Sequence, residues 1–138
     1  LLRLWQKNGI QAWDIPPASA LKTSIETITE YIDLHSSELL RVETLAVMCH
    51  MSYSYFARSF KQIYGKSCKE YIEFVKICKA DDLLLFTDHT LNYISQETGF
   101  TDCSHFIKTY KKIKGITPKQ RRMRHLSDAA SSFMHDSR

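Results

Sequence analysis

One segment of this sequence occurs twice, and the repeat limits the folds that the chain can adopt. Residues 52–65 align without gaps on residues 102–115. The identical positions are Ser54, Phe56, Lys61, Ile63 and Gly65 in the first copy and Ser104, Phe106, Lys111, Ile113 and Gly115 in the second. An internal repeat indicates one supersecondary unit that the chain uses more than once. The fold therefore has to accommodate two similar units, each built around the same kind of helix.

Each copy predicts a helix with one apolar face and one polar, basic face. If Phe56 or its counterpart Phe106 marks the middle of the buried face, the 100° step of an α-helix adds the aromatic residue and the isoleucine that follow it. The predicted buried faces are Phe56, Phe60 and Ile63 in the first copy and Phe106, Tyr110 and Ile113 in the second. The predicted outward faces are Ser54, Arg58 and Lys61, flanked by Ala57 and Gln62, and Ser104, Lys108 and Lys111, flanked by Ile107 and Lys112.

Length and composition indicate a small globular protein. A chain of 138 residues, 43% hydrophobic and 25% charged, can form one compact domain with at most a short appendage. No apolar run reaches the roughly 18 residues that a membrane span needs, and no secretory signal is evident. The four cysteines lack the paired spacing of a metal site. We therefore expect reduced thiols in a cytoplasmic protein, without a metal or another cofactor.

Basic residues gather in the second half of the chain. The whole sequence carries a formal net charge of +4. Between Cys103 and Ser127 it has eight Lys or Arg residues and no acidic residue. Such a stripe is the electrostatic footprint of a polyanion partner, but the solvated face of any protein can also be basic. The charge alone leaves both interpretations open.

Helical periodicity, with only four glycines and three prolines, predicts an all-α fold of about seven helices. The expected helices cover residues 19–35, 42–49, 53–64, 68–86, 91–98, 103–114 and a last segment from residue 118. The expected caps are Ser52, Thr90 and Asp102 at helix N-termini and Gly65 and Gly115 just after helix C-termini. His50 and Gly99 stand in tight turns, where a positive φ is expected.

The expected domain covers residues 21–125, with a shorter segment on either side. Within it, a short helix, a tight turn and a second helix are expected at residues 42–65 and again at residues 91–115. Residues 1–20, which contain Trp5 and Trp13, are expected to be a linker or the remnant of a further N-terminal domain. Residues 126–138 are small and polar, and we expect them to be disordered.

Two helix-turn-helix units joined by one long helix indicate a protein that binds DNA. A small residue near the start of each outward face allows close approach to a major groove, and Arg58 or Lys108 can then reach a guanine. Lys61 and Lys111 lie further along and are expected to contact phosphates. The long helix would span about 27 Å, against roughly 34 Å between successive major-groove faces. The two copies are similar, not identical, and follow each other head to tail in one chain, so we expect an asymmetric or direct-repeat site.

Three segments carry a specific pattern of residues. They are Glu-Thr-Leu-Ala at residues 43–46, the first repeat copy at residues 52–65, and residues 94–118 with Gly-Phe at 99–100, Ser-His-Phe at 104–106 and Gly-Ile-Thr-Pro at 115–118. The pattern resembles the DNA-binding domain of the AraC/XylS family of bacterial transcription regulators, over about residues 21–125. The resemblance implies about seven helices with two helix-turn-helix motifs, binding to promoter DNA and contact with RNA polymerase, usually as an activator. It also implies a separate upstream domain for sensing or dimerisation.

Carried over by position, the resemblance assigns base reading to Ser54, Ala57 and Arg58 in the first motif and to Cys103, Ser104, Ile107 and Lys108 in the second. Phosphate contacts are expected from Lys61, Gln62, Lys111, Lys112, Lys119, Arg121 and Arg122. The departures from the family pattern are Arg41 in place of a small capping residue, Ser95 in place of a packed alanine and Gln120 in place of an aromatic residue. Because Ala57 and Ile107 offer only apolar contacts, DNA shape is expected to contribute to specificity.

Other functions are weighed against this one. The sequence contains no combination of a nucleophile, a base and an orienting group, and the pair Asp81 and Asp82 is expected to face solvent, so we expect no enzyme. The alternative is a protein-interaction module, or a short form that modulates a full-length relative or RNA polymerase without strong DNA binding. Binding through several phosphates weakens steeply with salt, which separates the two functions.

Overall fold

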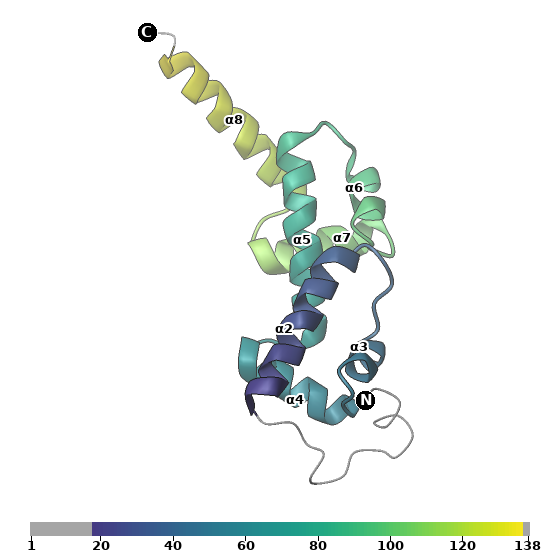
Figure 1. Ribbon diagram of the computed structural model, residues 1–138. Coiled ribbons are helices and arrows are strands. Elements are labelled where there is room, and N and C mark those ends of the chain that lie inside the picture. Colours follow the sequence, from purple (N-terminus) through teal and green to yellow (C-terminus); the bar gives the residue numbers. More distant parts are fainter. Residues whose placement is uncertain (1–17, 137–138) are drawn as a thin grey trace. The chain divides into compact units, whose positions relative to one another are not determined.

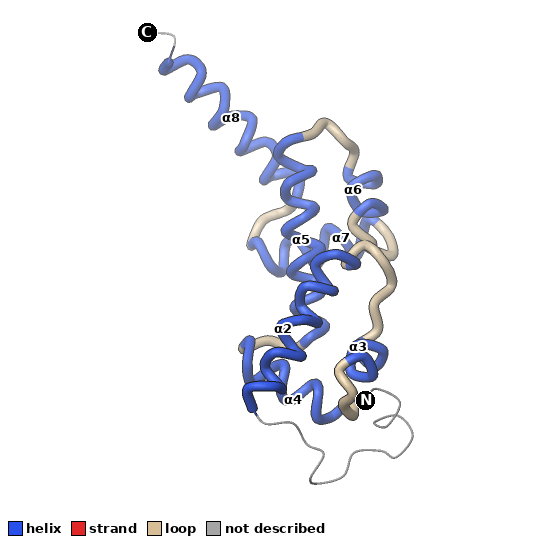
Figure 2. Tube along the Cα trace, in the orientation of Figure 1, coloured by secondary structure: helices blue, strands red, loops and turns tan. Residues whose placement is uncertain are grey.

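A computed structural model describes the backbone of residues 18–136 and the side chains of residues 24–132. Over this range the chain forms seven helices and no strand, which confirms the all-α prediction (Figures 1 and 2). The helices are α2 (Ala18–His35), α3 (Val42–Met48), α4 (Tyr53–Tyr64), α5 (Cys68–Phe86), α6 (Leu91–Glu97), α7 (Cys103–Lys114) and α8 (Pro118–Asp136). Apart from the end of α8, the predicted bounds agree with these to within one residue. Trp5 and Trp13 lie outside the described residues.

The described chain divides into two compact units, and the division falls within α5. The first unit, up to Ile72, contains α2, α3, α4 and the start of α5; the second, from Glu73, contains the rest of α5 with α6, α7 and α8. In each unit a short helix packs against the longer helix that follows it, α3 against α4 and α6 against α7. Each unit therefore contains one of the two predicted helix-turn-helix motifs.

The tight turns of both motifs are closed in the same way. His50 has a φ of 59°, and the amide of the next residue, Met51, donates to the carbonyl of Ala46 at 3.0 Å. In the second turn Gly99 has a φ of 87°. The amide of the next residue, Phe100, donates to the carbonyl of Ser95, again at 3.0 Å. This is the Schellman arrangement, which ends one helix and redirects the chain. The predicted positive φ of His50 is confirmed.

Side-chain caps begin the second helix of each motif as predicted. The Ser52 hydroxyl accepts a hydrogen bond from the Tyr55 amide at 3.2 Å, and the Asp102 carboxylate accepts one from the His105 amide at 2.7 Å. Arg41, before α3, makes no such bond with its side chain. Both second helices end at glycines with left-handed backbones, Gly65 with a φ of 75° and Gly115 with a φ of 83°. These caps fix the residues at which α4 and α7 begin and end.

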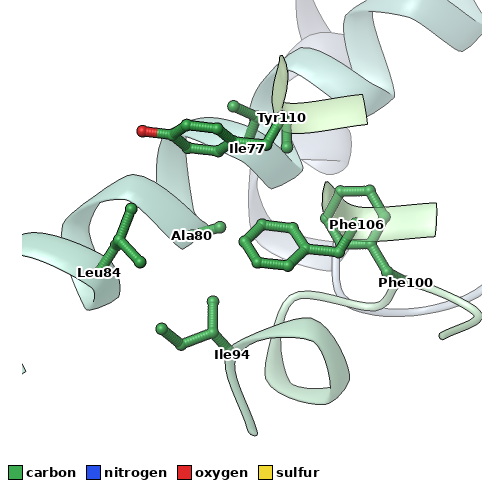
Figure 3. Close-up of a cluster of buried hydrophobic side chains, with 7 residues drawn as sticks. All are labelled: Ile77, Ala80, Leu84, Ile94, Phe100, Phe106 and Tyr110. Atoms are coloured by element: carbon green, nitrogen blue, oxygen red, sulfur yellow. The ribbon is translucent and has the colours of Figure 1, made fainter. Parts of the chain in front are cut away.

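The predicted buried faces form the centre of each unit. Phe56 and Phe60 of α4 are fully buried in the first unit. Figure 3 shows the core cluster of the second unit, which consists of Ile77, Ala80, Leu84, Ile94, Phe100, Phe106 and Tyr110. Ile63 and Ile113, predicted to complete the buried faces, are only half-buried, whereas Ser59 and Thr109 are buried. Each of these small side chains directly precedes a buried aromatic residue, Phe60 or Tyr110.

The end of the chain differs from the prediction, because α8 continues through residues 126–136 instead of becoming disordered. The helix starts with a capping box in which the Thr117 hydroxyl accepts from the Gln120 amide at 3.1 Å and the Gln120 side chain accepts from the Thr117 amide at 3.0 Å. Neither glycine nor proline follows Pro118 in the helix, so a helix begun this firmly can propagate through small, polar residues. No helix among the described residues is long and apolar enough to cross a membrane.

Candidate nucleic-acid interface

The outward face of α4 has the arrangement that the sequence predicts. Ser54, Arg58 and Lys61 are exposed, opposite the buried Phe56. At its edges, Ala57 is half-buried and Gln62 is exposed. A short hydroxyl, a long cation one turn later and a second cation further along thus form one accessible surface. Their exposure is confirmed, and their contact with DNA stays a prediction.

Helix α7 repeats this surface position by position. Ser104, Lys108, Lys111 and Lys112 are exposed, and Cys103 and Ile107 are half-buried at the edge of the buried face. The largest difference from α4 is chemical, since the last turn of α7 contains three lysines and that of α4 contains one. The second motif therefore presents more positive charge to a polyanion.

The predicted phosphate ligands on α8 differ in their environments. Lys119 is exposed and Arg121 is half-buried, but Arg122 forms hydrogen bonds with backbone carbonyls in its own unit. Its guanidinium donates to the carbonyls of Leu84 at 2.9 Å, His89 at 2.7 Å and Thr87 at 3.2 Å. These carbonyls lie at the end of α5 and just beyond it, where a helix has no backbone donors left for them. The three bonds show that Arg122 caps the end of α5. Its contact with phosphate stays a prediction, and such a contact would compete with these carbonyls for the same donors.

Asp81 does not face solvent as predicted. Its carboxylate accepts a hydrogen bond from the Tyr110 hydroxyl at 2.5 Å, and its other oxygen lies 3.9 Å from the Lys114 ammonium. Burial, together with the hydrogen bond to Asp81, raises the pKa of the Tyr110 hydroxyl above its ordinary value. Asp82, its neighbour, is exposed as expected.

Lys76 of α5 holds the second tight turn. Its ammonium donates to the Gly99 carbonyl at 2.9 Å and lies 5.6 Å from the centroid of the Phe100 ring. Burial lowers the pKa of Lys76. Sequence reasoning missed Lys76, because nothing in a sequence pairs a lysine with a carbonyl more than twenty residues away. The Thr117–Gln120 capping box, in contrast, has a recognisable spacing that could have been identified.

Two of the four thiols are buried in the first unit. Burial raises the pKa of Cys49 to about 11 and that of Cys68 to about 12. All four cysteines are free in the structure. Within residues 18–136, no group of three or more His, Cys, Asp or Glu residues is placed to hold a metal ion.

Comparison with known families gives a match over residues 45–124 to the family described as "Helix-turn-helix domain". Among curated proteins, the bifunctional transcriptional activator/DNA repair enzyme AdaA of Bacillus subtilis is 35% identical over 109 residues, which cover 79% of this chain and 51% of AdaA. The regulatory protein PocR of Salmonella typhimurium is 30% identical over 89 residues, which cover 64% of this chain and 29% of PocR. The chain thus spans about half or less of the length of these relatives.

Solved structures have the same fold. The C-terminal domain of the two-component response regulator yesN from Fusobacterium nucleatum is 30% identical, with a TM-score of 0.67 over 72% of this chain and 98% of that domain. The C-terminal domain of AraT, a response regulator from Geobacillus stearothermophilus, is 29% identical, with a TM-score of 0.71 over 75% of this chain and 86% of that one. The family match covers more than half of the chain and includes the second motif and all of the first except the start of α3. The chain therefore belongs to the AraC/XylS family of transcription regulators and forms a helix-turn-helix DNA-binding domain of that family.

Proposed function

We propose that this domain binds a specific site in double-stranded promoter DNA and inserts α4 and α7 into successive major grooves. The observation that supports this most strongly is the agreement between the two helices. At three matched positions each exposes a serine, a long cation and a lysine, on the side opposite a buried phenylalanine. One such surface is common on amphipathic helices, but two in the same register, each after a turn closed by the same backbone hydrogen bond, indicate one repeated task.

The proposed contacts follow from position on these surfaces. Base edges would be contacted by Ser54, Ala57 and Arg58 on α4 and by Cys103, Ser104, Ile107 and Lys108 on α7. Phosphates would be contacted by Lys61, Gln62, Lys111, Lys112, Lys119 and Arg121. Arg58 and Lys108 carry the donors that suit guanine O6 and N7, whereas the other cations position the protein on the duplex without reading sequence.

The proposal extends to transcription activation through RNA polymerase in the bacterial cytoplasm. The name of the relative AdaA includes transcriptional activation, which supports the same role for this chain. That name also includes DNA repair, but the present chain matches only 51% of AdaA, and the proposal includes no enzyme activity. Dimerisation is proposed to use a region upstream of the described domain.

Selection of bound fragments from random duplex DNA tests the proposal directly. We expect an enriched motif of about 20 base pairs with two unlike blocks about one helical turn apart. In a salt titration, the logarithm of the binding constant should fall with a slope of about −4 to −5, since each neutralised phosphate contributes about −0.9 and five cations are assigned to phosphates. A chain that enriches no motif and whose binding ignores salt would instead be a protein-interaction module.

A further inference from the structure

We propose that Asp81 is a positioning residue that sets the orientation of α7 and thereby the base preference of the second motif. Asp81 lies on α5 and contacts no base in the proposed mode of binding. Its carboxylate instead holds two side chains of α7, which is the helix that would enter the groove. The inference rests on the proposed function and adds to it a residue that determines specificity from outside the DNA interface.

The contacts of Asp81 fix α7 at two points. One carboxylate oxygen accepts from the Tyr110 hydroxyl at 2.5 Å, and the other lies 3.9 Å from the Lys114 ammonium. The Asp81 side chain is 17% exposed and that of Lys114 is 33% exposed. Tyr110 and Lys114 are four residues apart, so they lie on the same face of α7, one turn from each other. A single carboxylate thus restrains both the rotation of α7 and its position along its axis.

A polar restraint has an effect here that the apolar core does not supply. The ring of Tyr110 packs in the cluster shown in Figure 3, and its hydroxyl end points away from Phe100. Apolar contacts of this kind are not directional and tolerate small rotations. A hydrogen bond is directional and weakens when its angle changes. The bond to Asp81 therefore selects one rotation of α7 among those that the cluster would tolerate.

The rotation of α7 determines where its outward side chains lie. Lys108 lies two residues before Tyr110, which places it about 200° from Tyr110 around the helix and almost opposite the residue that Asp81 holds. At a helix radius of about 6 Å, a rotation of 10° moves a surface atom by about 1 Å. A displacement of this size removes the alignment that a hydrogen bond to a base edge requires. Contacts with phosphates tolerate it better, because they depend on charge more than on direction.

The first motif has no equivalent of this bond. Phe60 stands at the position of Tyr110 and has no hydroxyl. Its ring packs instead against Tyr64, with centroids 4.9 Å apart, and against Tyr71, with centroids 5.5 Å apart. The positioning role of Asp81 therefore belongs to the second motif alone. Loss of the bond should change one half of the DNA site and leave the other half unchanged.

Tyr110→Phe and Asp81→Asn test the inference by selection from random duplex DNA. Tyr110→Phe removes the hydroxyl and keeps the ring in the core, whereas Asp81→Asn keeps an acceptor and loses the charge facing Lys114. The matched control is Tyr71→Phe, which removes the Tyr71–Asp33 hydrogen bond of 3.4 Å in the first unit without altering α7. Lys108→Ala identifies the block of the selected motif that α7 reads. Thermal denaturation of each variant reports whether it folds.

We expect Tyr110→Phe to lower the base preference in the α7 block by about 3- to 10-fold. The other block should keep its preference, and the affinity for random duplex should stay within about 2-fold. Asp81→Asn should change the same block to a smaller extent, and Tyr71→Phe should change neither. A folded Tyr110→Phe variant with full preference in both blocks, or with equal losses in both, would overturn the role of Asp81 alone. A wild-type chain that selects no two-block motif would overturn the proposed function and this inference together.

Discussion

Arg58 is the residue that tests most directly whether α4 reads bases. It is exposed in the middle of the outward face, opposite the buried Phe56. Arg58→Ala should cost about 1–3 kcal/mol of binding free energy and relax the preference at one base pair, because a bidentate contact with guanine would be lost. Gel-shift titrations on the selected site and on single-base variants of it measure both effects.

Lys111 supplies the matched comparison, because it is also exposed but is assigned to a phosphate. Lys111→Ala should weaken binding to all sequences alike and reduce the magnitude of the salt slope by about 1. If Arg58→Ala and Lys111→Ala both leave the affinity unchanged, the outward faces of α4 and α7 do not contact DNA.

The basic side chain of Arg122 donates to three backbone carbonyls of its own unit. Arg122→Ala should lower the free energy of unfolding by about 1.5–3 kcal/mol, since three backbone carbonyls at the end of α5 lose a charged donor. Arg122→Lys keeps the charge but lacks the planar group that serves several carbonyls at once, so it should lose most of the same stability. Urea denaturation measures these differences.

The salt slope of DNA binding is the control for Arg122. It should be the same in folded Arg122→Ala as in the unaltered chain, in contrast to Lys111→Ala. If Arg122→Ala keeps the stability of the unaltered chain and the magnitude of its salt slope falls by about 1, Arg122 contacts a phosphate.

At the scale of elements, the two short helices α3 and α6 differ in polarity at one packed position. Ala46 of α3 and Ser95 of α6 are both 1% exposed, and the Ser95 hydroxyl has no hydrogen-bond partner among the described residues. Ser95→Ala should therefore raise the free energy of unfolding by about 1 kcal/mol, because an unsatisfied buried hydroxyl is removed. Ala46→Ser should lower it by a similar amount. Unchanged thermal stability in both variants would mean that Ser95 finds a partner in solution.

The helices could be predicted closely from the sequence because their boundaries are set locally. Ser52, Asp102, Gly65 and Gly115 act within four residues of themselves, and both caps and periodicity are visible in a sequence. The outward faces could be predicted for the same reason, as they follow from helix geometry once Phe56 is placed inside. The end of α8 was missed, because a polar composition alone does not stop a helix that has a strong cap.

Long-range polar contacts could not be predicted in the same way. Asp81 meets Tyr110 across 29 positions of sequence, and Arg122 meets the Leu84 carbonyl across 38. Nothing in the residue types distinguishes these side chains from solvated aspartates and arginines nearby. Only the packing of the second unit determines which charges are used internally and which remain available for a ligand.

At the scale of the whole molecule, each unit depends on its own aromatic centre. Phe106 is fully buried, with its ring centroid 5.3 Å from that of Phe100 and 6.0 Å from that of Tyr110. Phe106→Ala should lower the free energy of unfolding by about 3–5 kcal/mol, because it leaves a cavity in the core. The buried residues described in the core cluster around Phe106 run from Ile77 to Tyr110 and belong to the second unit, so the loss should fall mainly on that unit. Hydrogen exchange should accelerate in α6 and α7 more than in α3, and equal acceleration in all three helices would mean that the units unfold as one.

The second tight turn is one residue longer than the first, since residues 98–102 connect α6 to α7 and residues 49–52 connect α3 to α4. The same extra residue inside α7 would rotate everything after it by about 100° and bury the wrong side chains. In the turn, the extra residue does not change which side chains of α7 are buried, because the Asp102 cap after it fixes where α7 begins. The two motifs can thus differ in the length of their turns, and in the residues that they expose, independently of each other. A target with two dissimilar halves is the natural outcome of that freedom.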